Sequence, residues 1–161
     1  MNFMKKQTAG SGITFVAFVL SRVAIIVYNV NINSAGYFEN ATVPEAVMYN
    51  VFGIVFLAVI LVISQFSLKG AVDKVLTIVS DVLRIGTPVF FIAALMKLIS
   101  SRVQGFAFIY FSNEEVLHEV QTAENMSSAH GTIANIVLLG VTAVVAMTAA
   151  FFSMKKTQKA Q

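Results

Sequence analysis

The chain contains no cysteine among its 161 residues, and this absence removes several kinds of chemistry at once. Thiol catalysis, disulfide exchange, iron–sulfur clusters and cysteine zinc sites all depend on that side chain. Only two histidines, His118 and His130, are present, so ligands for haem or for a metal ion are few. We therefore expect no cofactor.

Charge is also scarce. Charged residues make up 12% of the chain and hydrophobic residues 57%, and the mean hydropathy is +0.79. A soluble domain carries about 25% charged residues, so this composition excludes an ordinary soluble enzyme, a disordered tail and a secreted disulfide scaffold. An integral membrane protein remains. The formal net charge of +3 reflects basic residues at membrane boundaries, so we expect no nucleic-acid partner.

Four long apolar runs fill most of the chain, and each approaches the roughly 20 residues that a helix needs to cross a hydrocarbon core about 30 Å thick. They are continuously apolar, without the alternation of a membrane β-barrel. The sequence therefore predicts an all-α, four-helix transmembrane bundle as one domain over 1–161. The predicted spans are residues 13–30, 47–68, 75–99 and 132–153.

The distribution of basic residues predicts the orientation. Lysines precede the first span, lie between the second and third, and follow the fourth; these are Lys5, Lys6, Lys69, Lys74, Lys155, Lys156 and Lys159. The connection over 31–46 contains no basic residue, and that over 100–131 contains one arginine and four glutamates. The positive-inside rule therefore predicts that both termini and the central loop are cytoplasmic. The short tails favour the plasma membrane, and specifically the inner membrane of a bacterium.

Residues 105–129 form the predicted outer interfacial segment. It opens with four aromatic residues within 105–111, which suit the headgroup region. The sequence Ser112-Asn-Glu-Glu115 then resembles a capping box at a helix start. Apolar residues at helical spacing follow it, so we expect a short amphipathic helix on the outer surface, between spans three and four.

A metal site in this segment has one argument in its favour. Glu115 and His118 have the i, i+3 spacing of di-iron carboxylate bundles, and Glu119 lies beside them. Such a site needs a second pair and two more glutamates inside a bundle, and this chain has a single pair at a predicted wet surface. A solvated acidic helix face is therefore the preferred interpretation, and we predict no metal.

Three charged residues fall within the predicted spans, at a cost of about 2.5–3.5 kcal/mol each near the bilayer centre. At 1.5 Å per residue, Arg22 lies about 13 Å along span one, and Asp81 and Arg84 about 9 and 13 Å along span three. We expect one charged layer in the cytoplasmic half. Asp81 pairs either with Arg22 across helices, with Arg84 along its own helix, or with both. The surplus positive charge suits a lipid phosphate, an anionic substrate or a carboxylate of a partner subunit.

No catalytic constellation accompanies these charges: the sequence has no glycine-rich phosphate loop, no Gly-x-Ser-x-Gly and no His-Glu-x-x-His. The leading hypothesis is therefore a non-enzymatic accessory or scaffold subunit of a larger membrane assembly. Its partners are the lipid bilayer and other membrane subunits or further copies of itself. A small homo-oligomeric transporter or channel that uses Arg22, Asp81 and Arg84 is the second hypothesis. A lipid-acting enzyme with metal at Glu115, His118 and Glu119 is the third.

Overall fold

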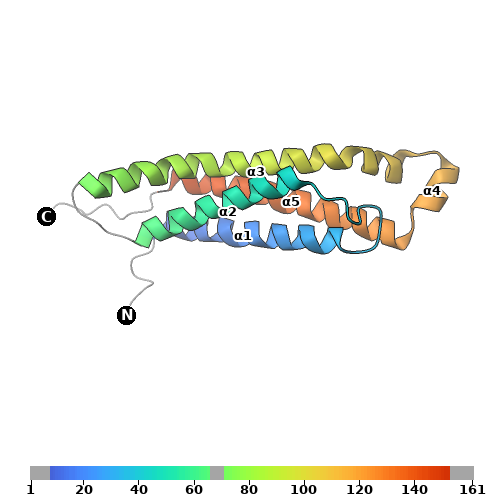
Figure 1. Cartoon of the computed structure of the whole chain (residues 1–161), viewed down its shortest axis with the longest axis horizontal. Helices are drawn as coiled ribbons and strands as arrows, with labels where there is room; N and C mark the ends of the chain where they lie inside the picture. Colours follow the sequence, from blue (N-terminus) through green and yellow to red (C-terminus); the bar gives the residue numbers. More distant parts are fainter. Residues whose placement is uncertain (1–7, 66–70, 153–161) are drawn as a thin grey trace.

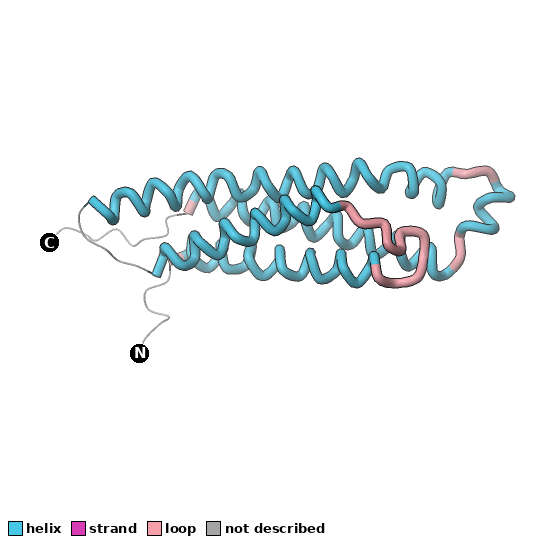
Figure 2. The backbone as a smooth tube through the Cα atoms, viewed as in Figure 1, coloured by secondary structure: helices cyan, strands magenta, loops and turns pink. Residues whose placement is uncertain are grey.

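The computed structural model describes residues 8–65 and 71–152 of the chain. Within these segments the chain forms five α-helices and no β-strand, as Figures 1 and 2 show. The helices are α1 (Ala9–Ile32), α2 (Pro44–Gln65), α3 (Ala71–Phe111), α4 (Glu114–Val120) and α5 (Ala123–Phe151). The predicted all-helical class is confirmed for these segments. Helices α1, α2, α3 and α5 are long and apolar enough to cross a membrane.

Three of the four long helices, α1, α3 and α5, have more residues than the spans predicted for them. The largest difference is in α3, which has 41 residues and a length of about 60 Å at 1.5 Å per residue. It begins four residues before the predicted span and continues through 100–111, which the sequence analysis assigned to a connection and an interfacial segment. Residues 66–68 and 153, at the ends of two predicted spans, lie outside the described segments. So do all the lysines named for the orientation except Lys74.

Side-chain caps fix where three helices begin. Thr8, Asn113 and Thr122 precede α1, α4 and α5, and each side-chain oxygen accepts a hydrogen bond from the backbone N–H three residues later. Helix α2 instead begins with Pro44, whose missing N–H is not needed at a first helical position. The predicted capping box of Ser112 and Glu115 is not formed, because the Ser112 hydroxyl donates to the Phe108 carbonyl at 2.8 Å and Asn113 caps α4 instead.

The four long helices pack side by side in the order α1, α2, α3, α5, and α5 closes the ring against α1 (Figure 1). We call this group the bundle. Helices α1 and α3 therefore occupy opposite corners, as do α2 and α5. Helix α1 begins at the same end as α5 ends, which we call the terminal end; α4 lies at the opposite end (Figure 1). Both ends of the described chain thus lie at the terminal end of the bundle.

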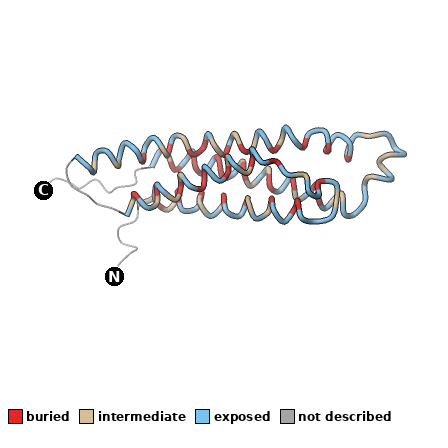
Figure 3. The backbone as a smooth tube through the Cα atoms, in the orientation of Figure 1, coloured by how far each residue is buried: buried red, intermediate tan, exposed pale blue. Residues whose placement is uncertain are grey.

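The core consists of three hydrophobic clusters stacked along the bundle, and Figure 3 shows their buried residues on the inward sides of the helices. The cluster nearest the terminal end surrounds Phe91, the middle cluster surrounds Leu98, and the third lies near α4 around Phe38 and Ile109. Alanine supplies many inward positions. Small side chains let helix backbones approach closely, which is how helices pack where lipid surrounds them.

Several buried polar side chains form hydrogen bonds within the bundle. Ser21, Thr87 and Thr142 each donate to a carbonyl of their own helix at 2.7–2.8 Å. Asparagines link α1 to α5: Asn31 donates to the Thr132 hydroxyl at 2.8 Å, and Asn135 donates to the Ala24 carbonyl at 2.5 Å. Such bonds satisfy polar groups that apolar surroundings would otherwise penalise.

Gly53 provides a sharp test of the contact between α2 and α3. A Cβ atom at this position would lie 2.5 Å from the Phe91 ring, and Phe91 is fully buried. We expect Gly53→Ala to lower the free energy of unfolding by about 1–3 kcal/mol through overpacking, as measured by reversible unfolding in lipid–detergent micelles.

The control for Gly53 is Gly12→Ala in α1, where a Cβ atom would meet nothing within 4 Å. That change should raise helix stability by up to about 1 kcal/mol, because alanine favours helix over glycine. Equal effects of the two substitutions would contradict the described packing of α2 on α3.

Candidate functional site: the charged residues of the long helices

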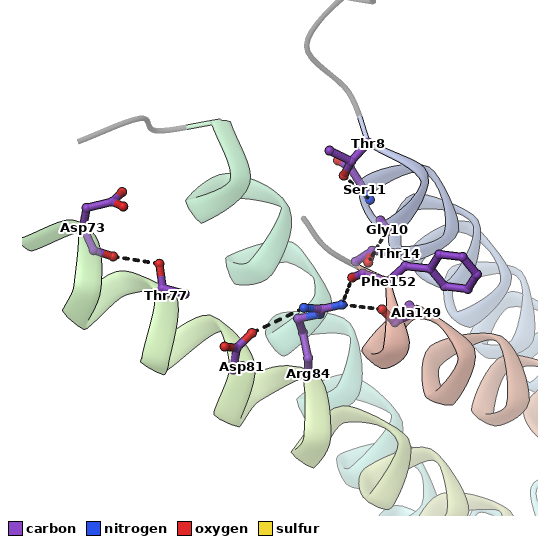
Figure 4. A network of polar contacts seen from close by, with 10 residues as sticks. All are labelled: Thr8, Gly10, Ser11, Thr14, Asp73, Thr77, Asp81, Arg84, Ala149 and Phe152. Carbon is purple, nitrogen blue, oxygen red and sulfur yellow. Dashed lines mark hydrogen bonds and ion pairs between the residues drawn. The ribbon is translucent and has the colours of Figure 1, made fainter. Parts of the chain in front are cut away.

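Arg84 and Asp81 form an ion pair on α3. Arg84 Nη1 lies 3.3 Å from Asp81 Oδ1, one helical turn earlier (Figure 4). The two ends differ in environment, because the Arg84 side chain is 10% exposed and that of Asp81 is 57% exposed. The predicted pairing along α3 is thus present. An exposed carboxylate contributes little to such a pair, so the environment of Arg84 depends on its other contacts.

Those contacts are with the end of α5. Arg84 Nη2 donates to the backbone carbonyl oxygens of Ala149 and Phe152, as Figure 4 shows. The last turn of a helix leaves carbonyl groups without partners and carries a partial negative charge. Helix α5 has no basic residue in its own last turn, and Arg84 of the neighbouring helix supplies one. The positive charge of Arg84 is therefore compensated by groups of this chain, the Asp81 carboxylate and the carbonyl groups at the end of α5.

Arg22 lies apart from this pair. It is exposed on α1, and α1 and α3 occupy opposite corners of the bundle. Its guanidinium carbon lies 5.7 Å from the centroid of the Phe18 ring, one turn earlier on the same helix. No ion pair joins Arg22 to another described residue. The predicted single layer of three charges is therefore not formed: Arg22 faces outward at the height of residues 91–98 of α3, whereas Arg84 faces inward nearer the terminal end.

The height of Arg22 along the bundle follows from its neighbours. Ala17 packs in the cluster that contains Phe91, and Ala24 packs in the cluster that contains Leu98. Arg22 lies between them, about 20 Å from the first residue of α1 and about 15 Å from the last. It is thus an outward-facing arginine in the middle third of a 24-residue apolar helix.

A fourth charged residue, Arg102, was missed in the sequence analysis. It is 4% exposed and donates to the Ala41 carbonyl in the loop between α1 and α2. Its guanidinium also lies 4.6 Å from the centroid of the Phe38 ring, at a distance typical of cation–π contacts. Arg102 therefore fixes the 33–43 loop against α3.

A signal for Arg102 exists in the sequence. Apart from Pro88, the buried positions of α3 recur at spacings of three or four residues; they are residues 80, 84, 87, 91, 94, 98, 102, 105 and 109. This period is that of one helix face. Extending the register of the third span past Ile99 places Arg102 on the inward face, whereas a loop after Ile99 gives it no defined direction.

The two buried arginines mark an interval on α3. Arg84 and Arg102 are 18 positions apart, about 27 Å along the helix. Lys97 is the one charged residue between them; its ammonium lies 3.6 Å from Glu45 at the start of α2, and both side chains are half-exposed.

The residues of the alternative metal site lie on and around α4. Glu115, His118 and Glu119 are all exposed. No group of three or more histidine, aspartate or glutamate side chains in the described segments is arranged to hold a metal ion. These residues do lie on a helix with the predicted spacing. The contacts of α4 with the rest of the described chain bring no further metal ligand to them.

Comparisons with models of protein families, with curated proteins and with solved structures find no match to this chain.

Proposed function

We propose that the protein is a non-enzymatic membrane subunit that spans the bilayer four times and binds another membrane protein through α1. The observation that carries this proposal is Arg22, an exposed charge midway along an apolar helix. Charged side chains within membranes almost always face a protein interior or water and find a partner. Among the described residues, the interaction found for the Arg22 guanidinium is its contact with the Phe18 ring, and no carboxylate pairs with it, so a partner outside the chain completes its environment.

The interval on α3 supports the placement in the membrane. About 27 Å separates Arg84 from Arg102, close to the hydrocarbon thickness of about 30 Å. With this interval spanning the core, Arg22 lies inside the hydrocarbon region. Stacking on Phe18 carries its guanidinium one turn, about 5 Å, toward the start of α1. That leaves about 14 Å to the first residue of the helix, so the side chain does not reach the membrane surface.

The proposed orientation has the terminal end in the cytoplasm. It depends on the positive-inside rule and on the lysines near both ends of the chain and in the central connection. In this orientation α4 lies outside, at the bilayer surface, and the proposed membrane is the plasma membrane of a bacterium. Tags introduced on either side of α4 and labelled with a membrane-impermeant reagent test the proposed orientation separately.

A second copy of the chain does not supply the counter-charge. At the height of Arg22, the neighbouring stretches are residues 46–57 of α2, 91–98 of α3 and 139–143 of α5. None of these stretches contains a carboxylate, and the carboxylate of Glu45, next to the α2 stretch, is already paired with Lys97 at 3.6 Å. In a parallel dimer both copies have the same heights, so Arg22 would meet no carboxylate except that of Glu45, which Lys97 already binds. A different membrane protein with a carboxylate in its membrane-spanning helix is therefore the proposed partner.

Arg22→Leu tests the proposal directly. We expect the variant to fold and insert normally, because Arg22 is exposed, and to lose at least about tenfold in recovery of the partner, equivalent to about 1.4 kcal/mol. The measurement is quantitative mass spectrometry of proteins that co-purify with the tagged chain after mild extraction from the host membrane.

The matched control is Val23→Leu, the adjacent exposed position of α1, which should leave recovery unchanged. Recovery of the same partners by Arg22→Leu and by the unmodified chain would sink the proposal. Equal loss in Arg22→Leu and Val23→Leu would indicate general disruption of α1 and would also count against a specific charge pair.

A further inference from the structure

The contact between α1 and α2 contains a small polar cavity. These two helices contact each other less extensively than the other adjacent pairs of the bundle. The cavity has a volume of about 10 Å³, which is the space that a single water molecule requires. Its walls are mostly aliphatic, but three polar side chains reach it: Tyr28 of α1, Asn50 of α2 and Asn135 of α5.

Two polar groups at this cavity have hydrogen-bonding capacity that no described residue satisfies. Asn50 is 5% exposed, and its Oδ1 atom is buried with no hydrogen-bond donor. The Tyr28 hydroxyl accepts a bond from the Val43 backbone N–H at 2.6 Å, and no bond donated by that hydroxyl is formed to a described residue. An acceptor without a donor and a hydroxyl proton without an acceptor thus line one cavity.

The geometry explains why these two groups do not bond each other. Tyr28 is held toward the start of α2 by the Val43 N–H, and Asn50 lies two turns further along α2. Asn135 is committed to the Ala24 carbonyl through its amide N–H and does not donate to Asn50. Hydrogen bonds therefore fix Tyr28 and Asn135 at the cavity, and the buried Asn50 lines the same space.

We infer that this cavity is a binding site for one water molecule, which donates to Asn50 Oδ1 and accepts from the Tyr28 hydroxyl. Water supplies both a donor and an acceptor, and Asn135 lines the same site as a further polar neighbour. Buried waters typically make two to four such bonds to groups that the protein leaves unpaired. The water joins α1 to α2 where their direct packing is weakest. The inference does not depend on the proposed partner or orientation.

Water-edited solid-state NMR on the full chain in lipid bilayers tests this site. Magnetisation starts on water protons and is detected on the side chains of labelled asparagine and tyrosine. We expect transfer to Asn50 at a rate comparable to that of a residue at the bilayer surface such as Asn33, which is exposed. Tyr28→Phe removes one of the two bonds, and we expect the transfer to Asn50 to be lost.

The control is Thr142→Val, which removes a buried hydroxyl that bonds only to the Leu138 carbonyl of its own helix. The Asn50 signal should persist in this variant. If Tyr28→Phe folds poorly, Asn50→Leu provides a second test, read as loss of transfer to Tyr28. A dry Asn50 in the unmodified protein would overturn the inference, as would transfer that is unchanged by Tyr28→Phe.

Discussion

Arg84→Met is expected to lower the free energy of unfolding by about 3 kcal/mol. The guanidinium bonds two carbonyl groups at the end of α5, and hydrogen bonds to charged groups contribute about 1.5–3 kcal/mol each. It also places a cation at the C-terminal end of that helix, which adds up to about 2 kcal/mol in buried geometries. The cost of burying the charge offsets part of this sum. Reversible unfolding in lipid–detergent micelles measures the loss.

Asp81→Asn separates the α5 contacts from the ion pair. The Asp81 side chain is 57% exposed, so its removal should cost at most about 1 kcal/mol. The arginine would keep its bonds to Ala149 and Phe152. An Asp81→Asn variant as unstable as Arg84→Met would show that the ion pair, and not the end of α5, determines the role of Arg84.

Arg102→Met is expected to release the loop over 33–43, with a loss of about 2–3 kcal/mol in the stability of that region. Two contacts disappear: the bond to the Ala41 carbonyl and the cation–π contact with Phe38. Hydrogen exchange provides the measurement, since Asn40 and Val43 donate their N–H groups to Ile32 and to Tyr28 at 2.8 and 2.6 Å. Both amides should exchange at least about thirtyfold faster, equivalent to about 2 kcal/mol.

Lys97→Met provides the control for Arg102. Lys97 is one turn away on the same helix, and it pairs with Glu45 at 3.6 Å between half-exposed side chains. We expect an effect below about 1 kcal/mol and no change in exchange at Asn40. Unchanged protection of the loop in Arg102→Met would contradict the anchoring role given to this arginine.

The four long helices were predictable because continuous apolar runs of this length have few other solutions. Their ends were not. The polar run Ser100-Ser-Arg-Val-Gln104 resembles a connection by composition, yet α3 continues through it. The inward positions of this part of α3 pack on the 33–43 loop and on the start of α5. These tertiary contacts determine where α3 ends, and composition alone does not indicate them.

The charged site was predictable in part. The i, i+3 spacing of Asp81 and Arg84 places both on one helix face whatever the fold, and the pair is present. Depth estimates counted from the start of each span put Arg22 in the same layer. They fail because the starts of α1 and α3 are not level: Ala17, near the start of α1, packs in the cluster of Phe91, which lies far along α3. The ring order of the helices also separates α1 from α3. The bonds from Arg84 to the end of α5 depend on that same order.

Native mass spectrometry of the protein, gently extracted from its own host membrane, shows directly whether another membrane protein is bound. We expect a reproducible heteromeric mass, in which a second membrane protein with an intramembrane carboxylate accompanies this chain. The heteromer should be absent for Arg22→Leu and present for Val23→Leu. A homo-oligomer with no other protein bound would contradict the proposed function, and would direct attention to a small carrier or channel instead.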